Sequence, residues 1–133
     1  MNTIGLDDRN YNWNPKSRQS KKSKYHLLAR RILIELFPFD NIYEEVTLPG
    51  TYVTGRNLIA DFLIPNKNML VEVHGEQHYS FNKFFHNSSP EYLRAKARDQ
   101  NKKQWCTLNG ITLIELPYNE TEHEWRARIS NQG

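Results

Sequence analysis

Hydrophobic residues recur with a helical period in the segment SKYHLLARRILIELF, residues 23–37. Leu28, Ile32 and Leu36 follow one another at intervals of four, which places them on one face of a helix. Ser23 precedes the first turn in the position of an N-cap, and a proline follows the last turn. The pattern therefore predicts an amphipathic helix.

Two further helices are predicted nearer the C-terminus. The longer one lies between Ser89, a residue suited to N-capping, and Gly110, which suits the position after a last turn. Pro90 takes its first helical position, where a missing N–H group costs nothing. The polar segment NETEHEWRARIS, residues 119–130, predicts the final helix.

Four apolar runs have the length and the bounding residues of strands, at residues 41–48, 57–64, 69–74 and 111–116. A short polar loop, NKN, joins the second run to the third and predicts a β-hairpin. The resulting order, α-β-β-β-α-β-α, is typical of an α/β (α+β) domain. We expect a mixed central sheet of about four strands flanked by helices.

Length and composition narrow the class of protein. A chain of 133 residues is long enough for one domain and too short for two. It has no apolar run of membrane-spanning length, and its N-terminus is polar. Cys106 is the sole cysteine, so the chain can build neither an internal disulfide nor a cysteine zinc site. We therefore expect an unsecreted protein, with no membrane partner, in a reducing cytoplasm.

Positive charge gathers at the N-terminal end. Residues 1–24 carry a formal charge of +4, whereas the remainder carries −1. Residues 1–22 show little periodicity, so we expect a flexible, basic arm there and a folded domain at 23–133. Such an arm either binds nucleic-acid phosphates or serves as a solubilising tail, and charge alone leaves both open.

Candidate chemistry lies in the predicted hairpin. Strand alternation places Asp61 on one face of its strand, and places Glu72 and His74 on one face of the next strand. If the polar positions align, the three side chains converge on one patch. Neighbouring carboxylates repel unless a cation or a proton neutralises them, and oxygen ligands beside an imidazole suit Mg²⁺ or Mn²⁺. Asp61 alone has a simpler explanation, which is an ion pair with an arginine.

Two neighbouring features extend this patch. Gly75 lets the chain turn directly after the strand, so that His78 can lie over the strand end. Asp99 lies in the middle of the second helix, one turn before Lys103. Asp99 either forms a solvated ion pair with that lysine or faces the sheet and orients a histidine. Spacing does not decide between the two.

The segments ADFLI, VEVHGEQHY and RDQNKKQWCTLNGITLIEL resemble nucleases with the very-short-patch-repair endonuclease fold. These form a branch of the PD-(D/E)XK superfamily that includes phage homing endonucleases. The resemblance covers residues 23–116. It implies that Asp61 is the central metal ligand, that the Val73 carbonyl is a second, that His78 activates water, and that Asp99 supports this machinery.

The sequence departs from the family pattern at two places. Glu72 and His74 take the E-x-K positions of the superfamily, so a histidine stands where lysine is usual and a histidine base is favoured. The family's glutamate in the first turn of the N-terminal helix corresponds to His26, and Glu35 is the only glutamate on that helix. Either the role has moved or the alignment has slipped.

The resemblance implies a metal-dependent DNA endonuclease of homing or repair type that uses Mg²⁺ or Mn²⁺, in the cytoplasm of a bacterium or a phage-infected cell. Its partner is double-stranded or structured DNA, and specificity comes from its own loops, from a homodimer or from a partner protein. Four aromatic residues follow the third strand: Tyr79, Phe81, Phe84 and Phe85. They either stack on or wedge between DNA bases or pack under their own loop as a satellite core. The residues expected to contact DNA are Lys16, Arg18, Lys21, Lys22, Lys24, Phe81, Lys83, Phe84, Lys102 and Lys103.

Two other hypotheses compete with this one. The first is a nucleic-acid-binding or phage accessory protein that keeps the nuclease fold without cutting. The second is a zinc site built from His74, His78 and His86 with a carboxylate, which ranks lower because no cysteine is near.

Overall fold

The computed structural model describes residues 1–52, 55–75 and 90–131, with the side chains of residues 91 and 92 left out. Its centre is a four-stranded sheet in the order β3-β4-β5-β6. The strands are β3 (Tyr43–Thr47), β4 (Ile59–Ile64), β5 (Met69–His74) and β6 (Thr112–Pro117).

The sheet is mixed, as the order of elements predicted. β3, β4 and β5 are successive antiparallel strands, and a short 3₁₀ turn at Pro65–Lys67 closes the β4–β5 hairpin. β6 then runs parallel to β5, because the chain crosses over through a long helix between them. The predicted α+β class and the mixed four-stranded sheet are confirmed.

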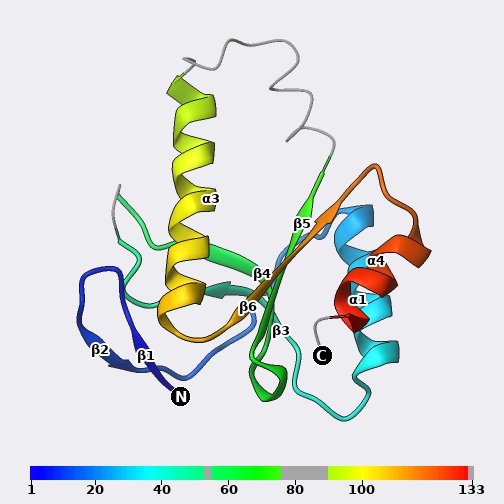
Figure 1. The fold of residues 1–133 in the computed structure, drawn as a ribbon, viewed down its shortest axis with the longest axis horizontal. Helices are drawn as coiled ribbons and strands as arrows, with labels where there is room; N and C mark the ends of the chain where they lie inside the picture. Colours follow the sequence, from blue (N-terminus) through cyan, green and yellow to red (C-terminus); the bar gives the residue numbers. More distant parts are fainter. Residues whose placement is uncertain (53–54, 76–89, 132–133) are drawn as a thin grey trace.

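Three helices cover the sheet (Figure 1). Helices α1 (Lys24–Leu36) and α4 (Glu122–Ser130) pack on one face, and α3 (Pro90–Leu108) packs on the other. The first face holds the larger apolar core, whose buried residues come from both helices and the strands. A smaller apolar cluster on the α3 side surrounds Trp105 and Cys106.

Local signals set the helix ends where the sequence predicted them. The Ser23 hydroxyl accepts a hydrogen bond from the His26 N–H group at 3.1 Å and caps α1. Thr121 and Glu124 form a reciprocal capping box at the start of α4. Gly110 follows α3 with a φ of +64°, a conformation that glycine adopts without strain.

The first residues fold differently from the expectation of an irregular arm. β1 (Asn2–Ile4) and β2 (Asn10–Asn12) form an antiparallel hairpin. The Asn109 side chain holds this hairpin, accepting from the Ile4 N–H group at 2.6 Å and donating to the Ile4 carbonyl at 2.9 Å. Strands of three residues are too short to show a periodicity, and Asn109 lies 105 residues away from Ile4, so the sequence pattern missed this element.

Residues 13–22 continue along the edge strand β3. The Arg18 N–H group donates to the Glu44 carbonyl at 2.9 Å, and the Glu44 N–H group donates to the Ser17 hydroxyl at 3.0 Å. The N-terminal segment thus packs on the same sheet as the rest of the chain. The prediction that residues 1–22 are a flexible arm and that residues 23–133 form the folded domain stays a prediction.

Among the helices in the described part of the chain, none is both long and apolar enough to cross a membrane.

Candidate functional site

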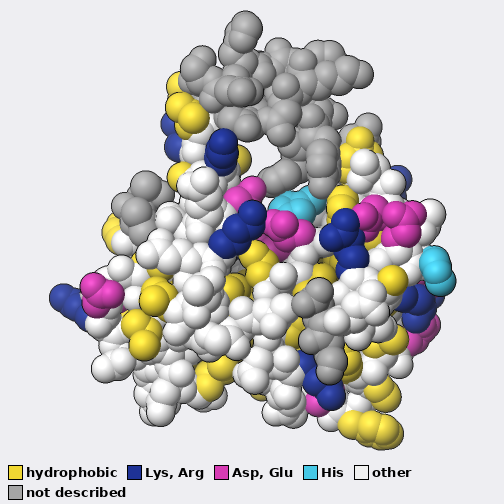
Figure 2. Space-filling view, viewed as in Figure 1, with side chains coloured by type: hydrophobic (Ala, Val, Ile, Leu, Met, Phe, Trp, Pro, Cys, Tyr) yellow, Lys and Arg dark blue, Asp and Glu magenta, His cyan; other side chains and the backbone are white. Residues whose placement is uncertain are grey.

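A polar cleft of about 240 Å³ lies between α3 and the sheet. Figure 2 shows acidic, histidine and basic side chains gathered at the middle of the molecule, beside α3. The cleft brings together Asp61, Glu72 and His74, as strand alternation predicted, and adds Asp99 from the helix. Its lining residues are Asp61, Glu72, Val73, His74, Ala95, Arg98, Asp99 and Lys102.

Asp61 lies where β4 and β5 stop pairing through their backbones. Backbone pairing between the two strands runs from Ile64–Met69 to Phe62–Val71. Beyond Phe62, hydrogen bonds from backbone N–H groups to side chains connect the strands instead. The Asp61 N–H group donates to Glu72 Oε2 at 2.7 Å, and the Val73 N–H group donates to Asp61 Oδ2 at 2.8 Å. These reciprocal bonds hold both carboxylates in fixed positions at the base of the cleft.

The surroundings of Asp61 favour its neutral form. Burial and the nearby negative charge of Glu72 raise the pKa of Asp61 to about 6, in that order of importance. The Val73 N–H bond and the positive charge of Lys102 act in the opposite direction. A carboxyl group with so raised a pKa is typical of a site that binds a cation or exchanges a proton.

Lys102 also lines the cleft. We expected it to contact DNA, and that contact stays a prediction; in this structure its ammonium group forms an ion pair with Glu72 Oε1 across the cleft. The Lys102 side chain is 15% exposed and that of Glu72 is 7% exposed. Neighbouring Lys103 is exposed, as a surface contact requires.

His74 lies close to an acidic residue that we did not predict from the sequence. Its Nε2 lies 3.3 Å from Glu115 Oε1 on β6. In the parallel β5–β6 pairing Glu115 stands opposite Glu72, so both acids point to the α3 face. The alternation of ITLIEL could have predicted that Glu115 shares a face with the cleft residues. Helical spacing could have predicted Arg98, which was also missed, because it lies one turn before Lys102 on α3.

Asp99 is half-buried and lines the cleft. Of the two alternatives for this residue, the structure places it on the side of α3 that faces the sheet. Its role as a supporting acid stays a prediction.

The site offers oxygen ligands for a hard cation. Asp61 and Glu72 supply carboxylates, and the Val73 carbonyl faces the same side, because the N–H and C=O groups of a residue in a strand point the same way. Within the described ranges, no three histidine, cysteine or acidic side chains are grouped closely enough to hold a metal ion. This small donor set fits Mg²⁺, which binds through one or two carboxylates and keeps several waters.

The two candidates for the family's helix glutamate lie outside the cleft lining. His26 is buried, stacks on Phe62 with ring centres 4.3 Å apart, and pairs with Glu44 at 2.8 Å. Glu35 forms an ion pair with Arg126 of α4. Neither placement supports a catalytic role, because both side chains are engaged in packing or ion pairs elsewhere.

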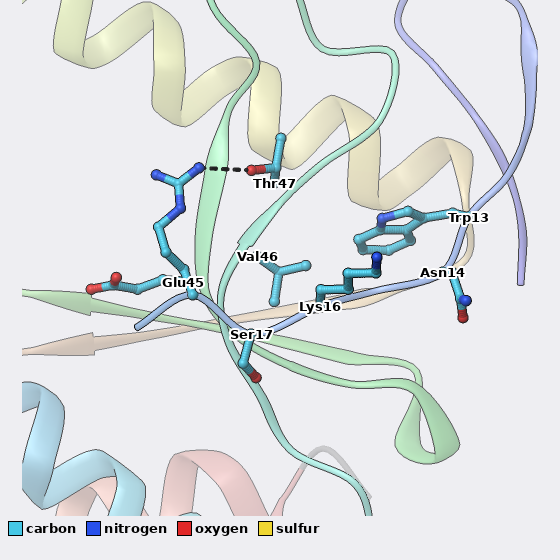
Figure 3. A pocket seen from close by; sticks show the side chains of 8 residues that line it. Trp13, Asn14, Lys16, Ser17, Glu45, Val46 and Thr47 are labelled. Atoms are coloured by element: carbon cyan, nitrogen blue, oxygen red, sulfur yellow. Dashed lines mark hydrogen bonds between the residues drawn. The ribbon is translucent and has the colours of Figure 1, made fainter. Parts of the chain in front are cut away.

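A second groove, of about 370 Å³, lies between residues 13–18 and β3 (Figure 3). Trp13, Lys16 and Arg18 are among its lining residues, and Arg18 donates to the Thr47 hydroxyl at 3.3 Å, the dashed line in Figure 3. Both cations remain placed for a nucleic-acid contact.

The other three residues near the N-terminus that we expect to contact DNA, Lys21, Lys22 and Lys24, differ in their surroundings. The Lys22 side chain is 8% exposed and paired with Glu45 at 2.9 Å, and its contact with DNA stays a prediction. Lys21 is exposed, and the Lys24 ammonium group lies 5.0 Å from the centre of the Tyr25 ring.

Several predicted site residues lie outside the described part of the chain. These are His78, Phe81, Lys83, Phe84 and His86. Their roles, and the zinc hypothesis that depends on two of them, stay predictions.

Comparison with known proteins finds viral relatives. The chain is 42% identical over 66 residues to uncharacterized protein 033L of Invertebrate iridescent virus 3, and 39% identical over 62 residues to uncharacterized protein 307L of Invertebrate iridescent virus 6. It is 38% identical over 66 residues to uncharacterized protein 094L of Frog virus 3. The matches cover 50%, 47% and 49% of this chain.

The chain spans less than half the length of these relatives, since the matches cover 34%, 32% and 43% of them. No protein-family model matches the chain. No solved structure matches it either.

Proposed function

We propose that this protein is a metal-dependent DNA endonuclease that hydrolyses phosphodiester bonds with Mg²⁺ or Mn²⁺. The observation that carries the proposal is the pairing of Asp61 and Glu72 at the end of the β4–β5 ladder, with the Val73 carbonyl facing the same side. Two carboxylates that share one cleft provide oxygen ligands for a divalent cation, and a phosphate can complete the coordination of Mg²⁺.

Each lining residue has a role in this proposal. Asp61 and Glu72 would hold a divalent cation, which would supply charge neutralisation at the phosphate and make a nearby water easier to deprotonate. His74 accepts a proton from the attacking water, and Glu115 orients its ring through the 3.3 Å contact. Arg98 and Lys102 approach from α3 and neutralise the phosphate charge. His78 remains the alternative base.

DNA is the proposed substrate because basic groups lie on both sides of the acidic floor. Arg98 lines the cleft itself, while Lys16 and Arg18 line the groove at β3, one strand away from Asp61 on β4. Such groups track phosphates without reading base sequence. The resemblance to very-short-patch-repair endonucleases points to the same substrate. The viral source of the relatives fits a virus-encoded enzyme.

The test is a cleavage assay on plasmid, nicked, branched and single-stranded DNA, with Mg²⁺, with Mn²⁺ and with EDTA. We expect cleavage that needs a divalent cation and that is lost in Asp61→Ala. Asp40→Asn is the matched control, because Asp40 is a partly buried acid that contacts Lys67 and Asn66, both outside the cleft lining.

Two results would overturn parts of the proposal. Cleavage that survives Asp61→Ala would refute this site. Binding to DNA without cleavage under every condition would refute the nuclease and would favour an inactive nucleic-acid-binding protein.

A further inference from the structure

The contact between Lys102 and Glu72 uses a carboxylate that the proposed function gives to a metal ion. Glu72 Oε2 accepts the Asp61 N–H group at 2.7 Å, and Glu72 Oε1 pairs with the Lys102 ammonium group. Both oxygens of Glu72 are thus engaged within the protein. The pair is also poorly accessible to water, with side-chain exposures of 7% for Glu72 and 15% for Lys102.

The positive charge of Lys102 offsets the negative charges of both carboxylates at the base of the cleft. Asp61 lies directly beside the Lys102–Glu72 pair, since its N–H group donates to Glu72 Oε2 at 2.7 Å. A buried carboxylate left without a positive partner is strongly destabilising. Lys102 therefore supplies the positive charge that allows Asp61 and Glu72 to lie side by side.

A divalent cation and the ammonium group compete for the same place. Bound to Asp61 and Glu72, the cation would lie within a few ångströms of Lys102 Nζ, where two positive charges repel across a poorly hydrated cleft. The divalent cation and the ammonium group would both lie at or next to Glu72 Oε1. The lysine is long and flexible, and it can move while the helix stays in place.

We propose that Lys102 neutralises Glu72 in the metal-free protein and is displaced from it when a divalent cation binds. This inference rests on the proposed function, since it assumes a cation at Asp61 and Glu72. The displaced ammonium group turns away from the metal ion, while Lys102 stays on the helix that lines the cleft. The lysine would then meet a DNA phosphate only after the metal has bound.

The test is a calorimetric titration with Mn²⁺, without DNA, of the unaltered protein, of Lys102→Met and of Lys103→Met. Removing the competing ammonium group should tighten Mn²⁺ binding by roughly tenfold or more in Lys102→Met. Lys103→Met removes the same charge from the exposed neighbouring position and should change the affinity by less than about twofold. Lys102→Gln, which is neutral but polar, replaces Lys102→Met should the latter fail to fold.

A second readout is structural. Crystals grown with EDTA should keep the Lys102–Glu72 contact, and crystals soaked with Mn²⁺ should show the ammonium group more than about 4 Å from Glu72. A lysine that stays on Glu72 beside a bound metal ion would overturn the inference, as would equal Mn²⁺ affinity in all the variants.

The two proposals fail in different ways. If the unaltered protein cleaves DNA and binds Mn²⁺ but Lys102→Met binds it no more tightly, only the inference falls. If Lys102→Met binds Mn²⁺ more tightly and no DNA is cut under any condition, the proposed nuclease activity is refuted, and the displacement of Lys102 by a metal ion is supported. If none of the proteins binds Mn²⁺, both fall.

Discussion

The two faces of the sheet are built by the same strands and are covered in different ways. On one face, α1 and α4 contribute Ala29, Ile32, Leu33, Trp125 and Ile129 to one continuous apolar core. On the other, the C-terminal part of α3 contributes Trp105 and Cys106 to a smaller apolar cluster, against which Leu6 and Trp13 of the N-terminal segment also pack. The preceding turns of α3 line the polar cleft instead.

The difference shows where this fold tolerates buried charge. In β5, Val71 enters the apolar core on one face, and its neighbour Glu72 enters the cleft on the other. A carboxylate at Val71 would enter the apolar core, whereas Glu72 meets a backbone N–H group and an ammonium group. The first face stabilises the fold, and the second holds the residues of the proposed chemistry at a cost in stability.

The largest effect should come from the cleft. Asp61→Asn keeps an oxygen that can accept the Val73 N–H bond but loses the negative charge that a metal ion needs. We expect cleavage to fall by roughly a thousandfold, about 4 kcal/mol in activation free energy. Initial rates with Mg²⁺ measure this. A variant that still cuts at a tenth of the normal rate would contradict the assignment of Asp61.

The apolar face should respond in stability instead. Ile32→Ala removes a fully buried side chain of α1 and should lower the free energy of unfolding by about 3 kcal/mol. Ile34→Ala, on the same helix at 52% exposure, is the control and should change it by less than about 0.5 kcal/mol. Urea unfolding measures both. At low temperature the folded Ile32→Ala protein should still cleave DNA, and a loss of cleavage there would break the division between the two faces.

The next effect is a dependence of stability on pH that belongs to the cleft. The pKa of Asp61 rises from 3.8 to about 6 on folding, so the folded state holds the proton more tightly. The favourable contribution of this group is complete below about pH 4 and is lost as the pH rises through 6.

At pH 7 without metal, Asp61→Asn should therefore be more stable than the unaltered protein, by on the order of 2–3 kcal/mol. The gap should close as the pH is lowered to 4. Urea unfolding in EDTA across this range tests the sign, and a variant that is less stable at pH 7 would contradict it.

The smallest effect should come from the acid on the outer side of α1. Glu35 pairs with Arg126 and Arg31 at the surface, and these guanidinium groups hold its pKa below the usual range, Arg126 most strongly. Solvent and salt screen such a pair. Glu35→Gln should therefore leave cleavage unchanged and shift the melting temperature only slightly. Loss of cleavage at an unchanged melting temperature would return Glu35 to the catalytic role that the resemblance left open.

The sequence by itself determined the three helices and the four strands of the central sheet, and the faces of the hairpin strands β4 and β5, although it missed the β1–β2 hairpin. Ser23 and Gly110 mark helix ends through local hydrogen bonding and backbone conformation, and the alternation along 57–64 and 69–74 predicted that Asp61 and Glu72 would share one side. These properties depend on neighbours within a few residues, so a single sequence contains them.

Tertiary structure decided which side chains meet in the cleft. Lys102 reaches Glu72 across 30 residues, and Glu115 reaches His74 across 41. These contacts depend on how far α3 stands from the sheet and on which strand β6 pairs with. Both follow from the packing of side chains throughout the domain, which no local pattern records.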